Sequence, residues 1–110
     1  HLERIRTAYR SRAVALADEL TTRLGDAVEL TVPDGGMFLW MAASDGTDTD
    51  DLLRRALEVG VAFVPGSAFR TRPPGSDTDA DNTTARLAFA SRPEEQLRAA
   101  ARRLAEVWRP

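Results

Sequence analysis

The chain of 110 residues has no cysteine and no lysine, and its single histidine is His1. Without cysteine there is neither a disulfide framework nor a thiolate nucleophile. Without lysine, no side chain can form a Schiff base with a carbonyl substrate or cofactor. One terminal histidine excludes a histidine general base and a multi-histidine metal site. We therefore expect no catalytic residue, no cofactor-binding residue and no metal ligand in this chain.

The charged residues exclude further classes of partner. All 15 basic residues are arginines, and with 17 acidic residues they give a net charge of -2. They are interleaved with Asp and Glu, which is typical of solvated helix faces, whereas nucleic-acid binding needs concentrated positive charge. No apolar run approaches the length of a membrane span, and no signal peptide is visible. We expect a cytoplasmic protein with neither nucleic acid nor membrane as a partner.

Length and composition predict one small globular domain. The chain is 43% hydrophobic and 29% charged, which is ordinary for a soluble domain with a modest core. It does not begin with Met, yet a helical pattern is already running in its first residues. We expect residues 1–110 to be one domain cut from a longer chain, although an artificial boundary would leave the same beginning.

The first of three helical patterns covers residues 2–24 and ends before Gly25. Its apolar stripe is expected to be core rather than a binding face for a partner. The stripe consists of Leu2, Ile5, Tyr9, Leu16, Leu20 and Leu24.

Two shorter helices follow. The second is expected to be capped by one of residues 47–49 and to stop at Gly60. The third is expected to start at Ser91, with Pro93 in its first turn and Glu94 completing a capping box. The inward side chains are expected to be Leu52, Leu53, Ala56 and Leu57 in the second helix, and Leu97, Ala100, Ala101, Leu104, Val107 and Trp108 in the third.

Four short segments have the composition of strands, namely residues 28–32, 37–41, 61–64 and 85–90. The second is apolar throughout, which is typical of a strand buried on both faces, and we expect something outside this chain to cover its second face. The order helix, strand, strand, helix, strand, strand, helix predicts an α+β fold. We expect a two-layer sandwich of a small, mainly antiparallel sheet and three helices.

The segment between residues 70 and 84 is expected to be a loop. Asp77, Asp79 and Asp81 match the opening of an EF-hand calcium loop. The match then fails, because Asn82 stands at the turn position and no Glu closes the loop. We expect a solvated acidic loop.

The last strand carries an arginine among apolar residues. Alternation places Leu87 and Phe89 on one face, and Arg86 with Ala88 and Ala90 on the other. The small neighbours allow a group to approach the guanidinium, and a carboxylate held bidentately is its best geometric match. The alternative to ligand binding is that Arg86 pairs with an Asp or Glu of the same chain, or lies at the edge of the sheet and reaches water. The strand alone favours this alternative.

Four segments in order resemble the C-terminal domain of a class I/II aminotransferase. They are PDGGMFLWM, GVAFVPGSAF, NTTARLAF, and a helix beginning RPEE and ending RRLAEV. The family consists of fold-type-I enzymes that use pyridoxal phosphate, and this chain is most similar to the 2-aminoadipate, kynurenine and aromatic group. The resemblance covers essentially the whole chain, and the ordered combination is more specific than any single motif.

The resemblance implies roles for particular residues. Arg86 would bind the α-carboxylate of the substrate. Phe38, in the segment that passes near the substrate, would line the pocket, although its sequence alone suits plain core equally well. Residues 65–69 would approach the active site. The cofactor lysine, the Asp that pairs with the pyridine nitrogen and the phosphate cup belong to the large domain in this family.

The chain would then be the small domain of an enzyme that moves an amino group between an α-amino acid and a 2-oxo acid. Its partner would be the large domain of the same parent chain, and the parent would be a homodimer. This fragment alone would be inactive and would bind pyridoxal phosphate weakly or not at all.

Two other functions are compatible with the sequence. The first is the aminotransferase-like effector domain of a GntR-type transcription regulator; such domains often lack the arginine in the last strand, so Arg86 favours the enzyme. The second is a free-standing ferredoxin-like regulatory domain that binds a ligand, which the strand-strand-helix rhythm permits.

Overall fold

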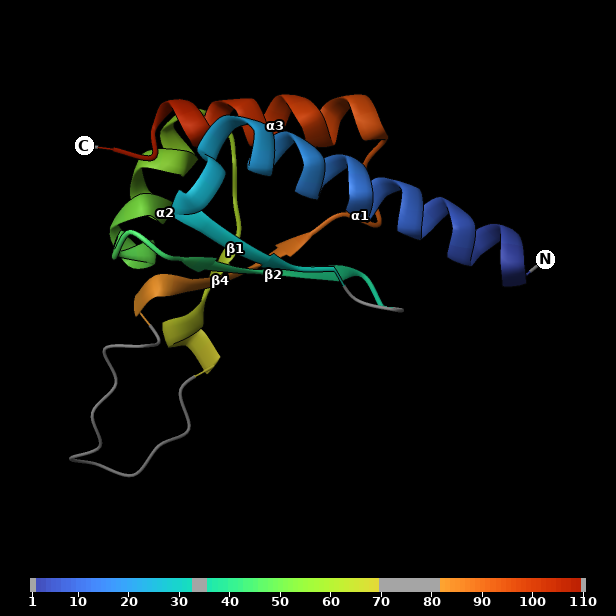
Figure 1. Cartoon of the computed structure of the whole chain (residues 1–110), viewed down its shortest axis with the longest axis horizontal. Coiled ribbons are helices and arrows are strands. Elements are labelled where there is room, and N and C mark those ends of the chain that lie inside the picture. Colours follow the sequence, from blue (N-terminus) through green and yellow to red (C-terminus); the bar gives the residue numbers. More distant parts are fainter. Residues whose placement is uncertain (1, 33–35, 70–81, 110) are drawn as a thin grey trace.

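The computed structural model describes residues 2–32, 36–69 and 82–109, and it confirms the predicted α+β fold and element order (Figure 1). In chain order the elements are α1 (Leu2–Leu24), the 3-10 turn η1 (Gly25–Ala27), β1 (Val28–Thr31), β2 (Phe38–Ala43), α2 (Thr49–Glu58), β3 (Val64–Pro65), the 3-10 turn η2 (Gly66–Phe69), β4 (Thr84–Ala88) and α3 (Glu94–Glu106). None of the helices in these ranges has both the length and the apolar character needed to cross a membrane.

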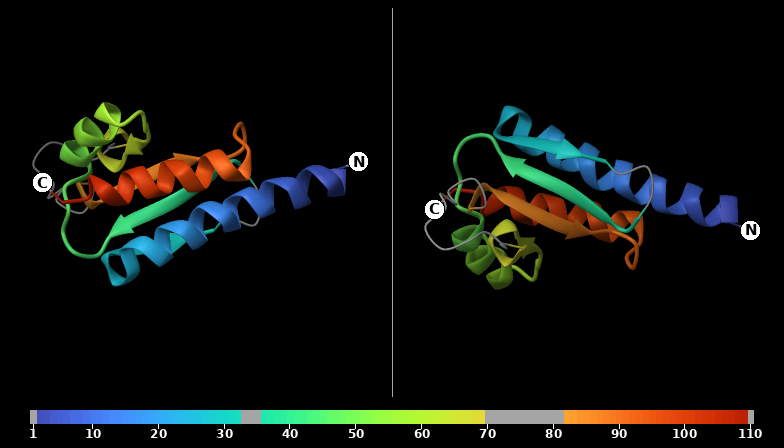
Figure 2. Two further views of the ribbon diagram at one scale, coloured as in Figure 1. Left: turned by 90° about the horizontal axis from the view of Figure 1, so that it is seen from above. Right: turned by 90° about the horizontal axis from the view of Figure 1, so that it is seen from below.

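The four strands form one antiparallel sheet in the order β1-β2-β4-β3. Helices α1 and α3 lie side by side on one face of this sheet, and α2 lies near the β3 edge (Figures 1 and 2). The opposite face carries no α-helix in the described part of the chain (Figure 2, right). We call the face against α1 and α3 the inner face and the opposite one the open face.

The core fills the space between the inner face and the two long helices. Alternation along β2 and β4 turns every second side chain inward, and the helical stripes supply the facing layer. Burying one large apolar side chain stabilises a fold by about 1.5–3 kcal/mol. The largest core side chains include Leu16, Leu20, Leu39, Met41, Leu52, Leu87, Phe89, Leu104 and Trp108.

Helix α1 extends beyond the rest of the domain at its N-terminal end (Figure 1). Leu2 is 71% exposed and Ile5 is 38% exposed, whereas Leu16 and Leu20 are buried. The expectation that the whole apolar stripe is core is therefore wrong for its first two turns, which lie beyond the sheet and α3. The predicted end at Gly25 is confirmed, and its φ of +54° lies in the region that favours glycine.

The predicted caps give one success and one failure. Asp48 caps α2, accepting hydrogen bonds from the backbone N–H groups of Asp50 (2.9 Å) and Asp51 (3.3 Å). Ser91 does not cap α3, which begins three residues later at Glu94 with Pro93 as its N-cap residue and no side-chain cap. The ψ of 157° at Pro93 keeps that residue extended, so the helix cannot start before it.

Two predictions about α2 and β3 are wrong in part. Leu57 is 57% exposed because α2 packs against the domain only through the side that carries Leu52 and Ala56. The strand predicted over residues 61–64 pairs only at Val64–Pro65. Val61 and Phe63 are nevertheless buried. The apolar pattern of residues 61–64 therefore reflects burial in the core and not pairing in the sheet.

Within this chain strand β2 is buried on its inner face only, and the expected cover of its second face from outside the chain stays a prediction. Its burial alternates, and Trp40 on the open face is 42% exposed. Strand β4 ends at Ala88, although the N–H of Phe89 still donates to the carbonyl of Met37 (3.2 Å). The EF-hand-like Asp77, Asp79 and Asp81 lie outside the described residues.

Candidate functional site

The predicted site residues meet on the open face of the sheet. Residues directly opposite each other in an antiparallel pair share a face. Arg86 of β4 is paired with Trp40 of β2 and with Val64 of β3, so these three side chains form a row across the sheet. Phe38 stands two residues before Trp40 and therefore also faces outward. The alternation predicted for Arg86 is confirmed, since Leu87 is buried in the core and Ala88 is exposed.

Two aromatic rings lie against the guanidinium of Arg86, and a third ring contacts one of them. Its central carbon, Cζ, lies 3.8 Å from the ring centre of Phe38 and 4.7 Å from that of Phe69. The Phe69 ring in turn contacts Trp40 edge to face, with centres 5.4 Å apart and planes at 62°. Both distances to Cζ are within the range of cation–π attraction. We call Phe38, Trp40 and Phe69 the aromatic cluster.

This environment does not supply all the hydrogen bonds that the Arg86 side chain can make. Its Nε atom is fully buried and has no hydrogen-bond partner among the described residues. The other arginines of the domain illustrate the usual outcome: Arg55 pairs with Asp51 and also donates to the carbonyl of Val107 (2.8 Å). A buried donor without an acceptor costs about 1–3 kcal/mol, so it is a feature that calls for an explanation.

The first turn of α2 holds the elements on both sides of Arg86. Thr49 is fully buried, and its hydroxyl donates to the carbonyl of Thr84 (2.8 Å), the first residue of β4, and lies 3.0 Å from the carbonyl of Asn82. The hydroxyl of Ser67 in η2 donates to a carboxylate oxygen of Asp50 (2.7 Å). One helix end therefore anchors both the strand that carries Arg86 and the turn that carries Phe69.

The arrangement is suited to holding a planar anion. Aromatic rings attract a guanidinium through its flat face, whereas hydrogen bonds are made in its plane along the N–H edges. The aromatic cluster therefore fixes the group without using the donors that a carboxylate needs. Ala88 and Ala42, which share this face, are small enough to let a ligand approach.

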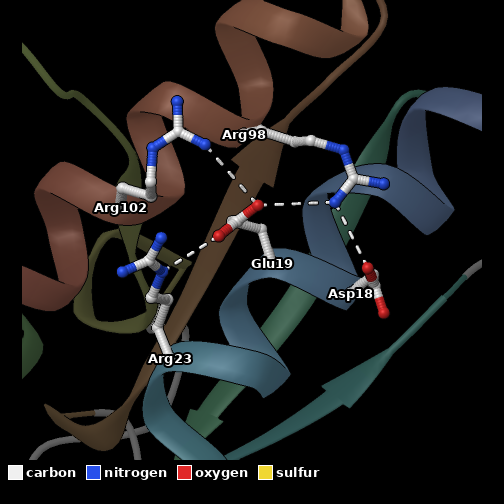
Figure 3. A network of polar contacts seen from close by, with 5 residues as sticks. All are labelled: Asp18, Glu19, Arg23, Arg98 and Arg102. Carbon is white, nitrogen blue, oxygen red and sulfur yellow. Dashed lines mark hydrogen bonds and ion pairs between the residues drawn. The ribbon is translucent and has the colours of Figure 1, made fainter.

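The main ion-pair network lies elsewhere, between α1 and α3 (Figure 3). Glu19, nearly buried, accepts from Arg23 Nε (3.0 Å) and Arg98 (3.4 Å) and lies 3.7 Å from Arg102, while Arg98 also reaches Asp18 (3.2 Å). The hydrogen bond from Arg23, above all, lowers the pKa of Glu19, and the other two arginines act in the same direction against its burial. This network joins two helices of the inner side and does not contact Arg86.

Phe38 and Arg86, the two site residues predicted from the sequence, lie in contact in the structure. Phe38 is not plain core, since it is half-buried on the open face with its ring against Arg86. Trp40 and Phe69 were not singled out individually. The alternation that assigns Phe38 to this face assigns Trp40 to it as well, so that residue had a sequence signal. Phe69 lies in residues 65–69, which the resemblance places near the active site, but no local pattern indicated its contact with Arg86, because that contact depends on the strand order.

Comparisons with known proteins give a consistent assignment. The profile of the family "Aminotransferase class I and II" matches residues 1–104. Aromatic-amino-acid aminotransferase 1 of Thermococcus litoralis is 40% identical over 107 residues, which is 97% of this chain and 24% of that protein. The α-aminoadipate aminotransferase of Thermus thermophilus, solved with N-(5'-phosphopyridoxyl)-L-leucine, superposes with a TM-score of 0.82 at 38% identity, over 97% of this chain and 26% of that one.

A weaker similarity connects the chain to a different class of protein. An uncharacterized HTH-type transcriptional regulator, YhdI of Bacillus subtilis, is 22% identical over 110 residues, covering all of this chain and 22% of the regulator. In each of these comparisons the chain spans about a quarter of the longer protein.

Proposed function

The chain belongs to the class I and II aminotransferases, and we propose that residues 1–110 form the small C-terminal domain of such an enzyme, in which Arg86 binds the α-carboxylate of the substrate. One observation carries the proposal. A guanidinium whose buried Nε has no partner among the described residues lies on the open face of the sheet, against aromatic rings. A substrate carboxylate would provide the missing acceptor.

The chemistry of the group favours a carboxylate over other anions of metabolism. The planar fork of arginine matches the two oxygens of a carboxylate through parallel hydrogen bonds. Every α-amino acid and every 2-oxo acid has such a group beside its reacting carbon. An arginine that binds it therefore serves both substrates of an amino-group transfer, whatever their side chains. Phe38, in contact with the same guanidinium, would form one wall of the pocket.

The open face supports the proposal that a second domain covers the site. Trp40 is 42% exposed and Phe69 is 39% exposed, although residues of this kind are normally removed from water. We infer that the large domain of the parent chain packs over this face and completes the pocket. The parent would act as a homodimer, as the family implies.

The residues of this chain do not make a site for pyridoxal phosphate. The sequence has no lysine to hold the cofactor covalently. The buried, unpartnered donor that the open face offers is one arginine, which suits a substrate carboxylate. We propose that the cofactor is held by the large domain. The isolated 110-residue chain should then leave the absorbance spectrum of added pyridoxal phosphate unchanged, and a strong spectral shift would place the cofactor site here instead.

The regulator is the less favoured alternative. Its identity to the chain is 22%, against 40% for the aminotransferase from Thermococcus litoralis. An effector domain also has no need of a carboxylate anchor, whereas the geometry around Arg86 is best explained by one. The sequence that precedes this domain in the parent decides between a cofactor-binding domain and a DNA-binding segment.

The test uses the full-length parent protein. The unmodified protein should contain bound pyridoxal phosphate and convert it in a half-reaction with an α-amino acid. Arg86→Ala should lower kcat/KM about 30-fold to several-thousand-fold for every α-amino acid tried, equivalent to roughly 2–5 kcal/mol for an unpaired buried charge. Arg86→Lys keeps the charge but loses the planar fork, so it should recover only part of the activity.

The matched control is Arg54→Ala, which removes an arginine whose side chain is 74% exposed on α2. It should leave kcat/KM unchanged. A parent protein that neither holds the cofactor nor reacts with any amino acid would overturn the enzymatic assignment. A fully active Arg86→Ala variant would overturn the role of Arg86 alone.

A further inference from the structure

We propose that Phe69 is a positioning residue for carboxylate binding and that Trp40 supports it. The Phe69 ring, braced by Trp40, holds the guanidinium of Arg86 in place while its N–H edge stays available to the ligand. This inference rests on the proposed function of Arg86. It goes further by assigning roles to two residues that the sequence analysis gave no individual role.

Among the described residues, Arg86 has no hydrogen-bond acceptor at its Nε. A long arginine side chain has many rotamers, and fixing them costs free energy unless neighbouring groups restrict them. In structural arginines a carboxylate or a carbonyl does this, as for Arg55. For Arg86 the described chain offers the ring contacts at 3.8 and 4.7 Å and no acceptor for Nε. The rings are therefore what holds the guanidinium.

A polar group that held Arg86 would interfere with ligand binding. A carboxylate beside Arg86 would occupy the N–H edge that the ligand needs and would repel an incoming anion. An aromatic ring over the face of the guanidinium does neither. The aromatic cluster is thus an arrangement that restrains an arginine and preserves its capacity for a bidentate ligand.

Phe69 and Phe38 are held in place in different ways. The backbone of Phe38 is fixed inside the sheet by pairing with Ala88. Phe69 belongs to the short turn η2 and is 39% exposed, so its position depends on few contacts. One is the edge-to-face contact with Trp40, and another is the hydrogen bond from Ser67 to Asp50. Phe69 is therefore the member of the aromatic cluster whose position is restrained by the fewest contacts.

Trp40 contacts the ligand-binding arginine through Phe69. It lies directly opposite Arg86 in the β2–β4 register, yet its ring contacts Phe69. Its position on a central strand makes it a rigid brace for a residue on a turn. Replacing Trp40 should therefore act on the ligand indirectly, through Phe69 and then Arg86, and with a smaller effect than replacing Phe69 itself.

The experiment measures carboxylate affinity in the full-length enzyme. Propionate, which has a carboxylate and no amino group, serves as a competitive inhibitor. Phe69→Leu keeps an apolar side chain but removes the π face. It should raise the inhibition constant of propionate and the KM of amino acids about 3- to 10-fold, the range of a partly desolvated cation–π contact, with kcat changed less than about two-fold. Trp40→Leu should give a smaller rise in the same direction.

Rescue and control variants separate positioning from simple stability. Phe69→Tyr and Trp40→Phe retain the rings and should restore propionate binding. Leu57→Ala, which removes a more exposed apolar side chain from α2, should change neither constant. The melting temperature of each variant is recorded, and Trp40→Leu supplies the same test if Phe69→Leu does not fold.

The decisive comparison repeats Phe69→Leu in the Arg86→Ala background. If Phe69 acts through Arg86, the second substitution should add no further loss of propionate binding. An equal loss in both backgrounds, or no loss from Phe69→Leu in the unmodified enzyme, overturns the positioning role and leaves Arg86 as the anchor. An Arg86→Ala variant with unchanged propionate affinity overturns the proposed function of Arg86, and the positioning role with it.

Discussion

The hydroxyl of Thr49 donates a hydrogen bond of 2.8 Å to the carbonyl of Thr84, and so joins the first turn of α2 to the first residue of β4. Thr49→Val keeps the shape of this buried side chain but removes the donor. It should destabilise the domain by about 1–3 kcal/mol, because the hydrogen bond to the part-buried Thr84 carbonyl is lost. Thermal unfolding should shift by about 4–8 °C for each kcal/mol in a domain of this size.

Thr49→Ser is the control for this prediction, since it retains the hydroxyl. In the parent enzyme Thr49→Val should also lower kcat/KM, because β4 carries Arg86. A melting temperature equal to that of the unmodified chain would show that the link from Thr49 to β4 contributes nothing.

Removing Arg86 should cost little stability, in contrast to removing a structural arginine. Arg86→Ala eliminates a buried, unpartnered Nε along with the ring contacts, so the two effects oppose each other and the net change should stay within about 1 kcal/mol. Arg55→Ala is the matched comparison: Arg55 pairs with Asp51 and donates to the carbonyls of Val107 (2.8 Å) and Trp108 (2.9 Å). Its loss should destabilise by about 1–3 kcal/mol.

Chemical denaturation of both variants tests this contrast. A large loss of stability for Arg86→Ala, equal to or above that of Arg55→Ala, would identify Arg86 as a structural ion-pair residue and would contradict the substrate-anchor assignment.

The Glu19 network should stabilise the domain at neutral pH and lose this effect in acid. The pKa of Glu19 is lowered in the folded chain, chiefly by the hydrogen bond from Arg23. The contribution is therefore complete above the ordinary value of 4.5 and disappears as the pH falls through the lower pKa of the folded chain. Glu19→Gln should destabilise the chain at pH 7 and have progressively less effect below pH 4.5.

Asp18→Asn is the control for Glu19→Gln. Asp18 is 63% exposed at its side chain and pairs with Arg98, so its loss should matter less at any pH. The measurement is the free energy of unfolding of the three chains across this pH range. A Glu19→Gln effect that stays constant down to pH 3 would exclude the carboxylate charge as its cause.

The isolated chain should self-associate through its open face. Trp40 and Phe69, whose rings are in contact, are 42% and 39% exposed, and contiguous apolar surface of this kind promotes association. Sedimentation equilibrium should detect oligomers whose amount falls in Trp40→Ser. Leu57→Ser, which changes an exposed leucine on α2, should leave association unchanged. If the isolated chain is strictly monomeric, this would contradict the proposal that the large domain of the parent covers the open face.

Much of this fold could be predicted from periodicity alone. The two-residue alternation of residues 85–90 assigned Arg86 to one face and Leu87 to the core, and the structure agrees. Residues 2–24 showed the long helix, because the 3.6-residue period continues over many turns. Such features depend on neighbours in the sequence, so a local pattern is sufficient to find them.

The remaining features depend on contacts between distant segments. Phe69 reaches Arg86 only because β3 pairs with β4, and no local pattern near Phe69 reports this pairing. The exposure of Leu2 and Ile5 depends on where α3 and the sheet end, which their own spacing cannot reveal. The failed cap at Ser91 arose because several residue types there suit a helix start, and the backbone of Pro93 decided among them.

The side-by-side packing of α1 and α3 has a consequence for biosynthesis. Arg98 of α3 reaches Asp18 of α1 across 80 residues, and Trp108, beyond the end of α3, is fully buried. A ribosome therefore releases α1 and most of the sheet before the helix that completes their core has been made. During that interval the nascent chain exposes apolar surface, which makes this stage the most prone to aggregation and chaperone capture.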